Sequence, residues 1–85
     1  MDKLYPNESP YTPSEKDVKN IDNNFVYHPP KDHQIGKYNL IRENAKEFAK
    51  FLTILCPASR ELSLALTKLE EAVFWANASI ARNER

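Results

Sequence analysis

A tyrosine and an arginine fifteen residues apart have the clearest binding chemistry in this sequence. Tyr27 offers an aromatic face, and stacking of a nucleic-acid base on such a face is worth about 1–3 kcal/mol. Arg42 carries a guanidinium fork that suits a phosphodiester, and several lysines lie in the same region. The pair therefore indicates a site for a small nucleotide. The alternatives are that Tyr27 packs across the end of a helical hairpin and that Arg42 lies on a solvated helix face.

Catalytic and metal chemistry have little support. Cys56 is followed by Pro57 at a predicted turn, and both histidines are distant in the sequence, so no base is available to activate a nucleophile. No Gly-rich phosphate loop is present. His28, Asp32 and His33 are close together, but their spacing matches no defined metal site. The sequence therefore predicts no enzyme, no metal centre and no cofactor.

Two long amphipathic helices must position these groups. The first is predicted from Asp32, whose carboxylate can serve as N-cap, to about Leu55. The second is predicted over residues 57–83, with Pro57 in its first turn. Apolar residues recur at alternating spacings of three and four in both, so each helix has one apolar face. The two stripes are Tyr38, Ile41, Ala45, Phe48, Leu52 and Leu55, and Leu62, Leu66, Leu69, Val73, Ala76 and Ile80.

The short break at residues 56–59 makes the two helices antiparallel neighbours, and the fold class is an all-α two-helix hairpin. Several large apolar residues lie off the two stripes. They are Leu40, Phe51, Ile54, Leu64, Phe74 and Trp75. Either they widen one intramolecular core or they contact other subunits. A lone hairpin in a chain of 85 residues is marginally stable, so we predict a homo-oligomer in which hairpins complete each other's core.

The first 24 residues form a separate segment. Pro6, Pro10 and Pro13 punctuate it, and no helical or strand period is sustained. The Asn- and Asp-rich end of this segment disfavours more than a weak helical turn after Lys16. We therefore predict a flexible or loosely docked extension over residues 1–24 and a hairpin domain over residues 25–85. Between them, Pro29 and Pro30 stiffen the chain that carries Tyr27.

Composition excludes several partners. The net charge is zero, which argues against binding to DNA or RNA polymers and to anionic membranes. A single cysteine excludes an internal disulfide and favours a reducing, intracellular setting. The N-terminus has no apolar h-region and no run approaches transmembrane length, so we expect neither a signal peptide nor a membrane span.

Two sequence motifs add information beyond composition and periodicity. They are YHPP at residues 27–30 and CPASRELSLALTKLEEAVFWANASIARN at residues 56–83. Residues 25–84 resemble the phage anti-CBASS cyclic-oligonucleotide sponge family, whose hairpin is also found in anti-Thoeris sponges. The resemblance implies a helical homo-hexamer in the cytoplasm of an infected bacterial host. It also implies that the protein binds cyclic di- and trinucleotide messengers without cleaving them and so keeps the downstream effector inactive.

The resemblance also implies site residues. Tyr27 matches the family's dinucleotide-binding tyrosine, and Arg42 takes the place of a basic residue that is usually lysine. His28 and Lys31 are the expected neighbours in that site, and Arg82 is the candidate for a separate trinucleotide site. Two other functions stay open. One is a helical adaptor that binds a host protein through the spare apolar face, and the other is a phosphodiesterase that destroys the messenger.

Overall fold

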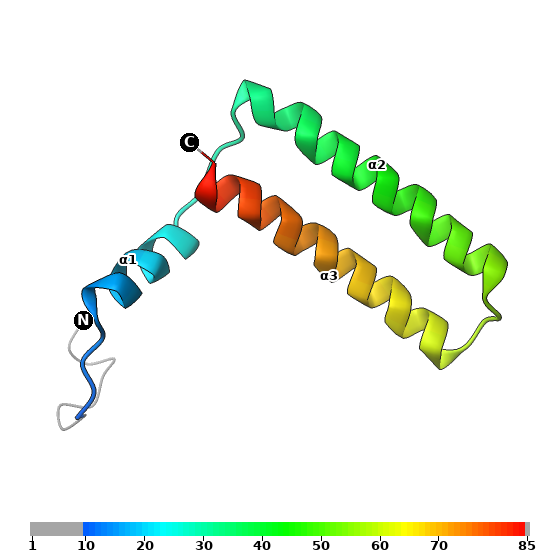
Figure 1. The fold of residues 1–85 in the computed structure, drawn as a ribbon, viewed down its shortest axis with the longest axis horizontal. Coiled ribbons are helices and arrows are strands. Elements are labelled where there is room, and N and C mark those ends of the chain that lie inside the picture. Colours follow the sequence, from blue (N-terminus) through cyan, green and yellow to red (C-terminus); the bar gives the residue numbers. More distant parts are fainter. Residues whose placement is uncertain (1–9, 85) are drawn as a thin grey trace.

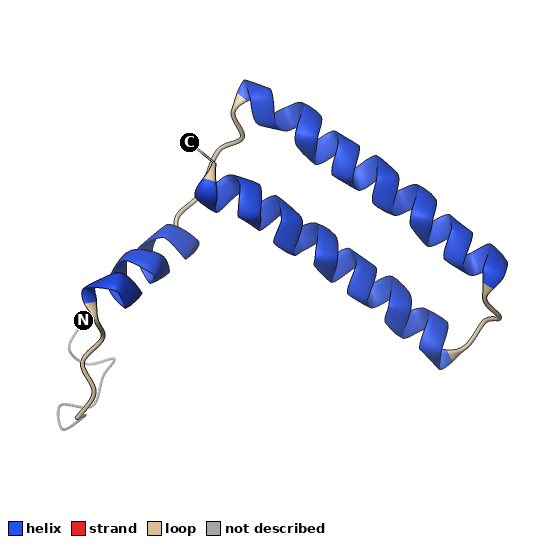
Figure 2. Ribbon diagram, viewed as in Figure 1, coloured by secondary structure: helices blue, strands red, loops and turns tan. Residues whose placement is uncertain are grey.

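Two long antiparallel helices form the body of the molecule, and a shorter helix projects from one end of it (Figure 1). The computed structural model describes residues 10–84. Its helices are α1 (Glu15–Asn24), α2 (Asp32–Leu55) and α3 (Arg60–Asn83). Figure 2 shows only helices and loops in this part of the chain. The predictions of an all-α fold and an antiparallel hairpin are confirmed.

Helix α2 has the predicted bounds, but its N-cap is Lys31 rather than Asp32. The backbone N–H of Lys31 donates to Oε1 of Gln34 at 3.0 Å, so the Gln34 side chain satisfies the cap. Asp32 lies in the first turn, where a carboxylate is stabilised by the helix dipole. The predicted capping role of Asp32 is therefore wrong by one position.

Helix α3 begins three residues later than predicted, because Ser59 is its N-cap. Its Oγ accepts from the backbone N–H of Leu62 at 3.1 Å. Pro57 lies in the connection instead of the first turn. A residue that precedes proline favours extended backbone, and Cys56 has φ −114° and ψ 140°. The end at Asn83 is as predicted.

Helix α1 lies where the sequence predicted no more than a weak turn. A capping box starts it: Asp17 N donates to Ser14 Oγ at 3.0 Å, and Ser14 N donates to Asp17 Oδ2 at 3.4 Å. Two donors of the first turn are thus satisfied at once, which offsets the poor helix propensity of the asparagines. Residues 1–9 of the predicted extension lie outside the described part of the chain.

The hairpin does not bury its own apolar residues completely. Between residues 10 and 84, no apolar side chain is fully buried, and Gln34 is the one buried residue, at 3% exposure. The whole α3 stripe is half-buried, whereas Phe48 and Leu55 of the predicted α2 stripe are exposed. Ala49 takes up the half-buried position beside Phe48. The six off-stripe apolar residues are all exposed, so the hairpin alone leaves a large apolar surface in water.

Replacement of the α3 cap tests this account of the hairpin. Ser59→Ala removes the acceptor for Leu62 N–H, and we expect the free energy of unfolding to fall by about 1 kcal/mol. Chemical denaturation followed by circular dichroism measures the change. The matched control is Ser63→Ala, an exposed serine one turn later inside α3, which we expect to leave stability nearly unchanged. Equal effects of the two substitutions would contradict the capping role.

Candidate functional site

Polar contacts join all three helices at the open end of the hairpin, where α2 begins and α3 ends. Asn23 at the end of α1 donates from Nδ2 to the backbone carbonyl of Arg82 at 3.0 Å. His28 Nε2 donates to the carbonyl of Asn23 at 2.8 Å, which fixes the proton on Nε2 when the ring is neutral. The segment that carries Tyr27 is therefore tied at both sides of that residue.

A second set of contacts at the open end centres on Glu84. Its carboxylate pairs with the Lys37 ammonium and lies 3.1 Å from His33 Nε2. The hydrogen bond from Lys37, followed by one from Gln34, lowers the pKa of Glu84 below its ordinary value. These contacts hold the end of α3 against the first two turns of α2.

Three of the predicted site residues share one cavity at the open end. The cavity has a volume of about 270 Å³ and contains His28, Lys31 and Arg82, with Glu84 in its wall. The sequence had assigned His28 and Lys31 to one site and Arg82 to another. The structure places the three cationic or ionisable groups together, because an antiparallel hairpin sets the start of α2 beside the end of α3.

Arg42 belongs to a neighbouring, shallower cavity of about 330 Å³. His28 lines this cavity too, together with Tyr38 and Asn77. The Arg42 guanidinium is oriented by Asn39, whose Oδ1 accepts from Nη1 at 2.9 Å. Tyr27 lines neither cavity and is 80% exposed. His28 therefore lines both the Arg82 cavity and the Arg42 cavity. Tyr27 and Arg42 do not share a cavity within a single chain.

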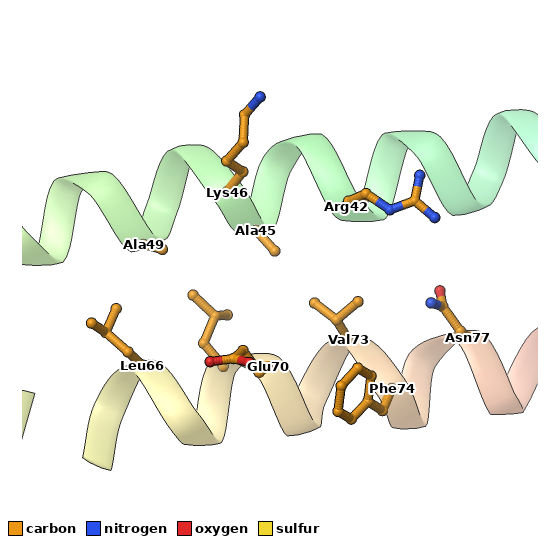
Figure 3. Close-up of a pocket in the computed structure, with 10 residues that line it drawn as sticks. Arg42, Ala45, Lys46, Ala49, Leu66, Glu70, Val73, Phe74 and Asn77 are labelled. Atoms are coloured by element: carbon orange, nitrogen blue, oxygen red, sulfur yellow. The ribbon is translucent and has the colours of Figure 1, made fainter. Parts of the chain in front are cut away.

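An apolar groove of about 590 Å³ runs between α2 and α3 (Figure 3). Ala45 and Ala49 form its α2 side. Leu66, Leu69, Val73 and Phe74 form most of its α3 side. Figure 3 shows Arg42 and Asn77 at the same end of the groove on opposite helices, while Lys46 points away from α3. We call this feature the interhelical groove.

Asn77 is a site residue that sequence reasoning missed. It lines both the interhelical groove and the Arg42 cavity. Its Oδ1 is buried and accepts no hydrogen bond from the described residues. A buried carbonyl without a donor costs about 1–3 kcal/mol, so we expect water, a ligand or another protomer to supply a donor to Asn77. One asparagine inside an amphipathic helix gives no sequence signal for such a role.

Trp75, predicted only as an off-stripe apolar residue, is a second candidate site residue. The Arg82 guanidinium carbon lies 5.9 Å from the centre of the Trp75 ring, a cation–π contact. Both residues line a further open cavity of about 390 Å³. Trp75 and Arg82 are seven residues apart, or two helical turns, so their spacing did contain a signal. The pair presents an aromatic face beside a cation.

Two other kinds of feature would point to a different function. Across residues 10–84, no three His, Cys, Asp or Glu side chains come together as a metal-binding group would. None of the described helices combines the length and the apolar character that a membrane span requires.

Acid unfolding tests the Glu84 contacts. Because folding lowers the pKa of Glu84 below 4.5, its contribution to stability is fully present above pH 4.5 and is lost as pH falls through the lower folded pKa. We expect Glu84→Gln to destabilise the protein at neutral pH and the difference from the parent to shrink below pH 4.5. Urea denaturation at several pH values measures it. Glu47→Gln, in an exposed pair with Lys50, is the control and should show little effect.

Comparison with known proteins identifies the family. A family model described as Acb2/Tad1, hairpin domain, matches residues 16–81. The match includes nearly all of α1, so it begins before the resemblance at residues 25–84. No curated protein and no solved structure matches the chain. The matched region covers most of the chain, which therefore belongs to the Acb2/Tad1 hairpin-domain family, the anti-CBASS and anti-Thoeris sponges that sequester cyclic nucleotide messengers.

Proposed function

We propose that this protein binds cyclic di- and trinucleotide immune messengers, such as 3′,3′-cyclic GMP–AMP, in the cytoplasm of an infected bacterial host. It holds the messengers intact and so prevents activation of the CBASS effector. The family match carries this proposal. Tyr27, His28, Lys31 and Arg42 lie inside the matched region, and Arg82 lies one residue beyond it.

The distribution of apolar surface supports assembly of the sponge from several copies. A single chain leaves every described apolar side chain at least partly exposed to water, and self-association is the simplest way to cover that surface. We propose a homo-hexamer, as the family resemblance implies. Stability then depends on protein concentration, because association stabilises the folded state by mass action.

A dinucleotide site made by two protomers fits the positions of Tyr27 and Arg42. Within one chain, Tyr27 is exposed and shares no described cavity with Arg42. A cyclic dinucleotide has two bases and two phosphates, and a two-fold interface presents two copies of each side chain. Tyr27 then stacks on a base while Arg42, already oriented by Asn39, binds a phosphate. His28 lines the Arg42 cavity and adds a ring nitrogen, and Lys31 lies in the adjacent open-end cavity and adds positive charge.

A separate trinucleotide site is assigned to Arg82. Its guanidinium lies against the exposed ring of Trp75, and its cavity at the open end includes Lys31. The Trp75 ring beside the Arg82 guanidinium suits a base and its phosphate. Sequestration at either site needs tight stoichiometric binding and no bond cleavage.

The decisive experiment is isothermal titration with 3′,3′-cyclic GMP–AMP, followed by heat denaturation and chromatography of the released nucleotide. Tight binding with the cyclic compound recovered intact is expected. Linear product would identify a phosphodiesterase and contradict sequestration. The exposed Phe74 and Trp75 favour the helical adaptor as second candidate. Absence of heat with any cyclic di- or trinucleotide, together with loss of a protein partner on Trp75→Ala, would support that function instead.

Substitution of the two main dinucleotide-binding residues should separate nucleotide binding from oligomer assembly. We expect Tyr27→Ala and Arg42→Ala each to lower the affinity for cyclic GMP–AMP by about tenfold to a hundredfold, because a stacking face or a phosphate partner is lost. Tyr27→Phe keeps the ring and should bind nearly as the parent does. Titration calorimetry gives the affinity and light scattering gives the mass. Parental affinity in both alanine variants would refute the site.

Arg82→Ala should act on the other ligand class. We expect the affinity for cyclic tri-AMP to fall by about tenfold or more. Cyclic GMP–AMP should bind as before, because Arg42 and Tyr27 are unchanged. Arg60→Ala, at the opposite end of α3, is the charge-matched control. A loss of both ligands in Arg82→Ala would mean that the open-end cavity forms one site rather than two.

A further inference from the structure

Helix α1 carries an apolar stripe that its own chain leaves uncovered. Val18, Ile21 and the C-cap Phe25 follow spacings of three and four, so they lie on one face. Their exposures are 42%, 52% and 87%. Because the helix is ten residues long, packing must supply most of its stability beyond the capping box. Its exposed stripe therefore needs a partner surface.

The contacts of the open end keep α1 away from its own hairpin. Asn23 is bonded to the carbonyl of Arg82, His28 is bonded to Asn23, and the stiff Pro29-Pro30 pair follows. Figure 1 shows α1 extending outward from the open end rather than folding back along α2 or α3. The interhelical groove starts further along the hairpin, between Arg42 and Asn77, and runs away from α1. The α1 stripe thus cannot reach the groove of its own chain without breaking these contacts.

The interhelical groove has the form that an apolar helix face requires. Ala45 and Ala49 are one turn apart on α2, and their small side chains leave space between the two helices (Figure 3). Leu66, Leu69 and Val73 supply apolar surface on the α3 side. An amphipathic helix binds such a groove with residues spaced three and four apart. Val18, Ile21 and Phe25 have this spacing.

Charge on the two surfaces is complementary on the α2 side of the groove. Glu15 and Asp22 flank the α1 stripe on one side and Asp17 flanks it on the other. The α2 side of the groove is lined by Arg42 and Lys46. The one recorded ion pair of Lys46 is with Glu43 at 3.2 Å, an exposed pair within α2 that is worth little and can exchange. The α3 side of the groove contains the acidic Glu70, so the acidic edges of α1 find basic groups on the α2 side only.

We propose that α1 of one protomer docks into the interhelical groove of a second copy of this chain. The apolar stripe fills the groove floor, and the acidic residues on one edge of the stripe face Lys46 on α2. The proposal concerns assembly and does not depend on nucleotide binding, so it can fail while the sponge function holds, and the reverse.

Cysteine cross-linking between two variants tests the docking directly. In a Cys56→Ser background, one protein carries Ile21→Cys and the other, made heavier by a fusion tag, carries Ala45→Cys. We expect a mixed disulfide of intermediate mass after mild oxidation of the mixture. Lys19→Cys, on another face of α1, replaces Ile21→Cys in the control and should give much less product. No excess of the Ile21 cross-link over the Lys19 control would overturn the proposal, as would preferential Ile21–Ile21 pairing.

Charge placed on the stripe gives an independent measurement. We expect Val18→Asp with Ile21→Asp to lower the mass measured by light scattering at micromolar concentration. Asn20→Asp with Asn24→Asp adds the same charge to other faces of α1 and should keep the parental mass. Circular dichroism confirms that both proteins retain α2 and α3. A parental mass in the first variant would contradict docking on another copy and would point to a different partner for α1.

Discussion

The limited apolar contact between two helices governs the rest of this structure. A helix in a hairpin can turn one stripe toward its neighbour, and both α2 and α3 carry more apolar residues than one stripe holds. Even the residues of the stripes stay partly in water. The most buried residue is instead the polar Gln34, which caps α2 at the open end. Polar contacts at that end, and apolar contacts with other copies of the chain in the proposed assembly, therefore both stabilise the fold.

At the open end of the hairpin, the polar contacts lie beside the proposed binding residues. Hydrogen bonds from Asn23 and His28 tie α1 and the following linker to α3, and Glu84 ties α3 to α2. These same contacts position His28, Lys31 and Arg82 around one cavity. Tight binding of the kind proposed here depends on such preorganisation, because ordering of the site on binding would subtract from affinity.

The sequence predicted α2 and α3 well because helical periodicity is repeated over many turns in each. Helix α1 was not predicted, because its apolar stripe is short and its asparagines disfavour a helix. The capping box of Ser14 and Asp17 outweighs both. Among the site residues, the meeting of Lys31 with Arg82 follows from antiparallel packing alone. The separation of Tyr27 from Arg42 and the unpaired Asn77 Oδ1 could not be predicted. They depend on side-chain orientation and on groups from outside the chain, which periodicity does not encode.

The carboxylate of Glu84 has a consequence for ligand selection. It acts as an internal counter-ion, since it neutralises Lys37 beside the open-end cavity that contains Lys31 and Arg82. An arriving phosphate gains less attraction than it would at a bare cluster of cations. Simple anions, which offer charge and nothing more, are then held weakly. A cyclic nucleotide adds base stacking on an aromatic face and so exchanges favourably with the surrounding anions. In a cell filled with phosphorylated metabolites, that exchange would keep the proposed site free for its messenger.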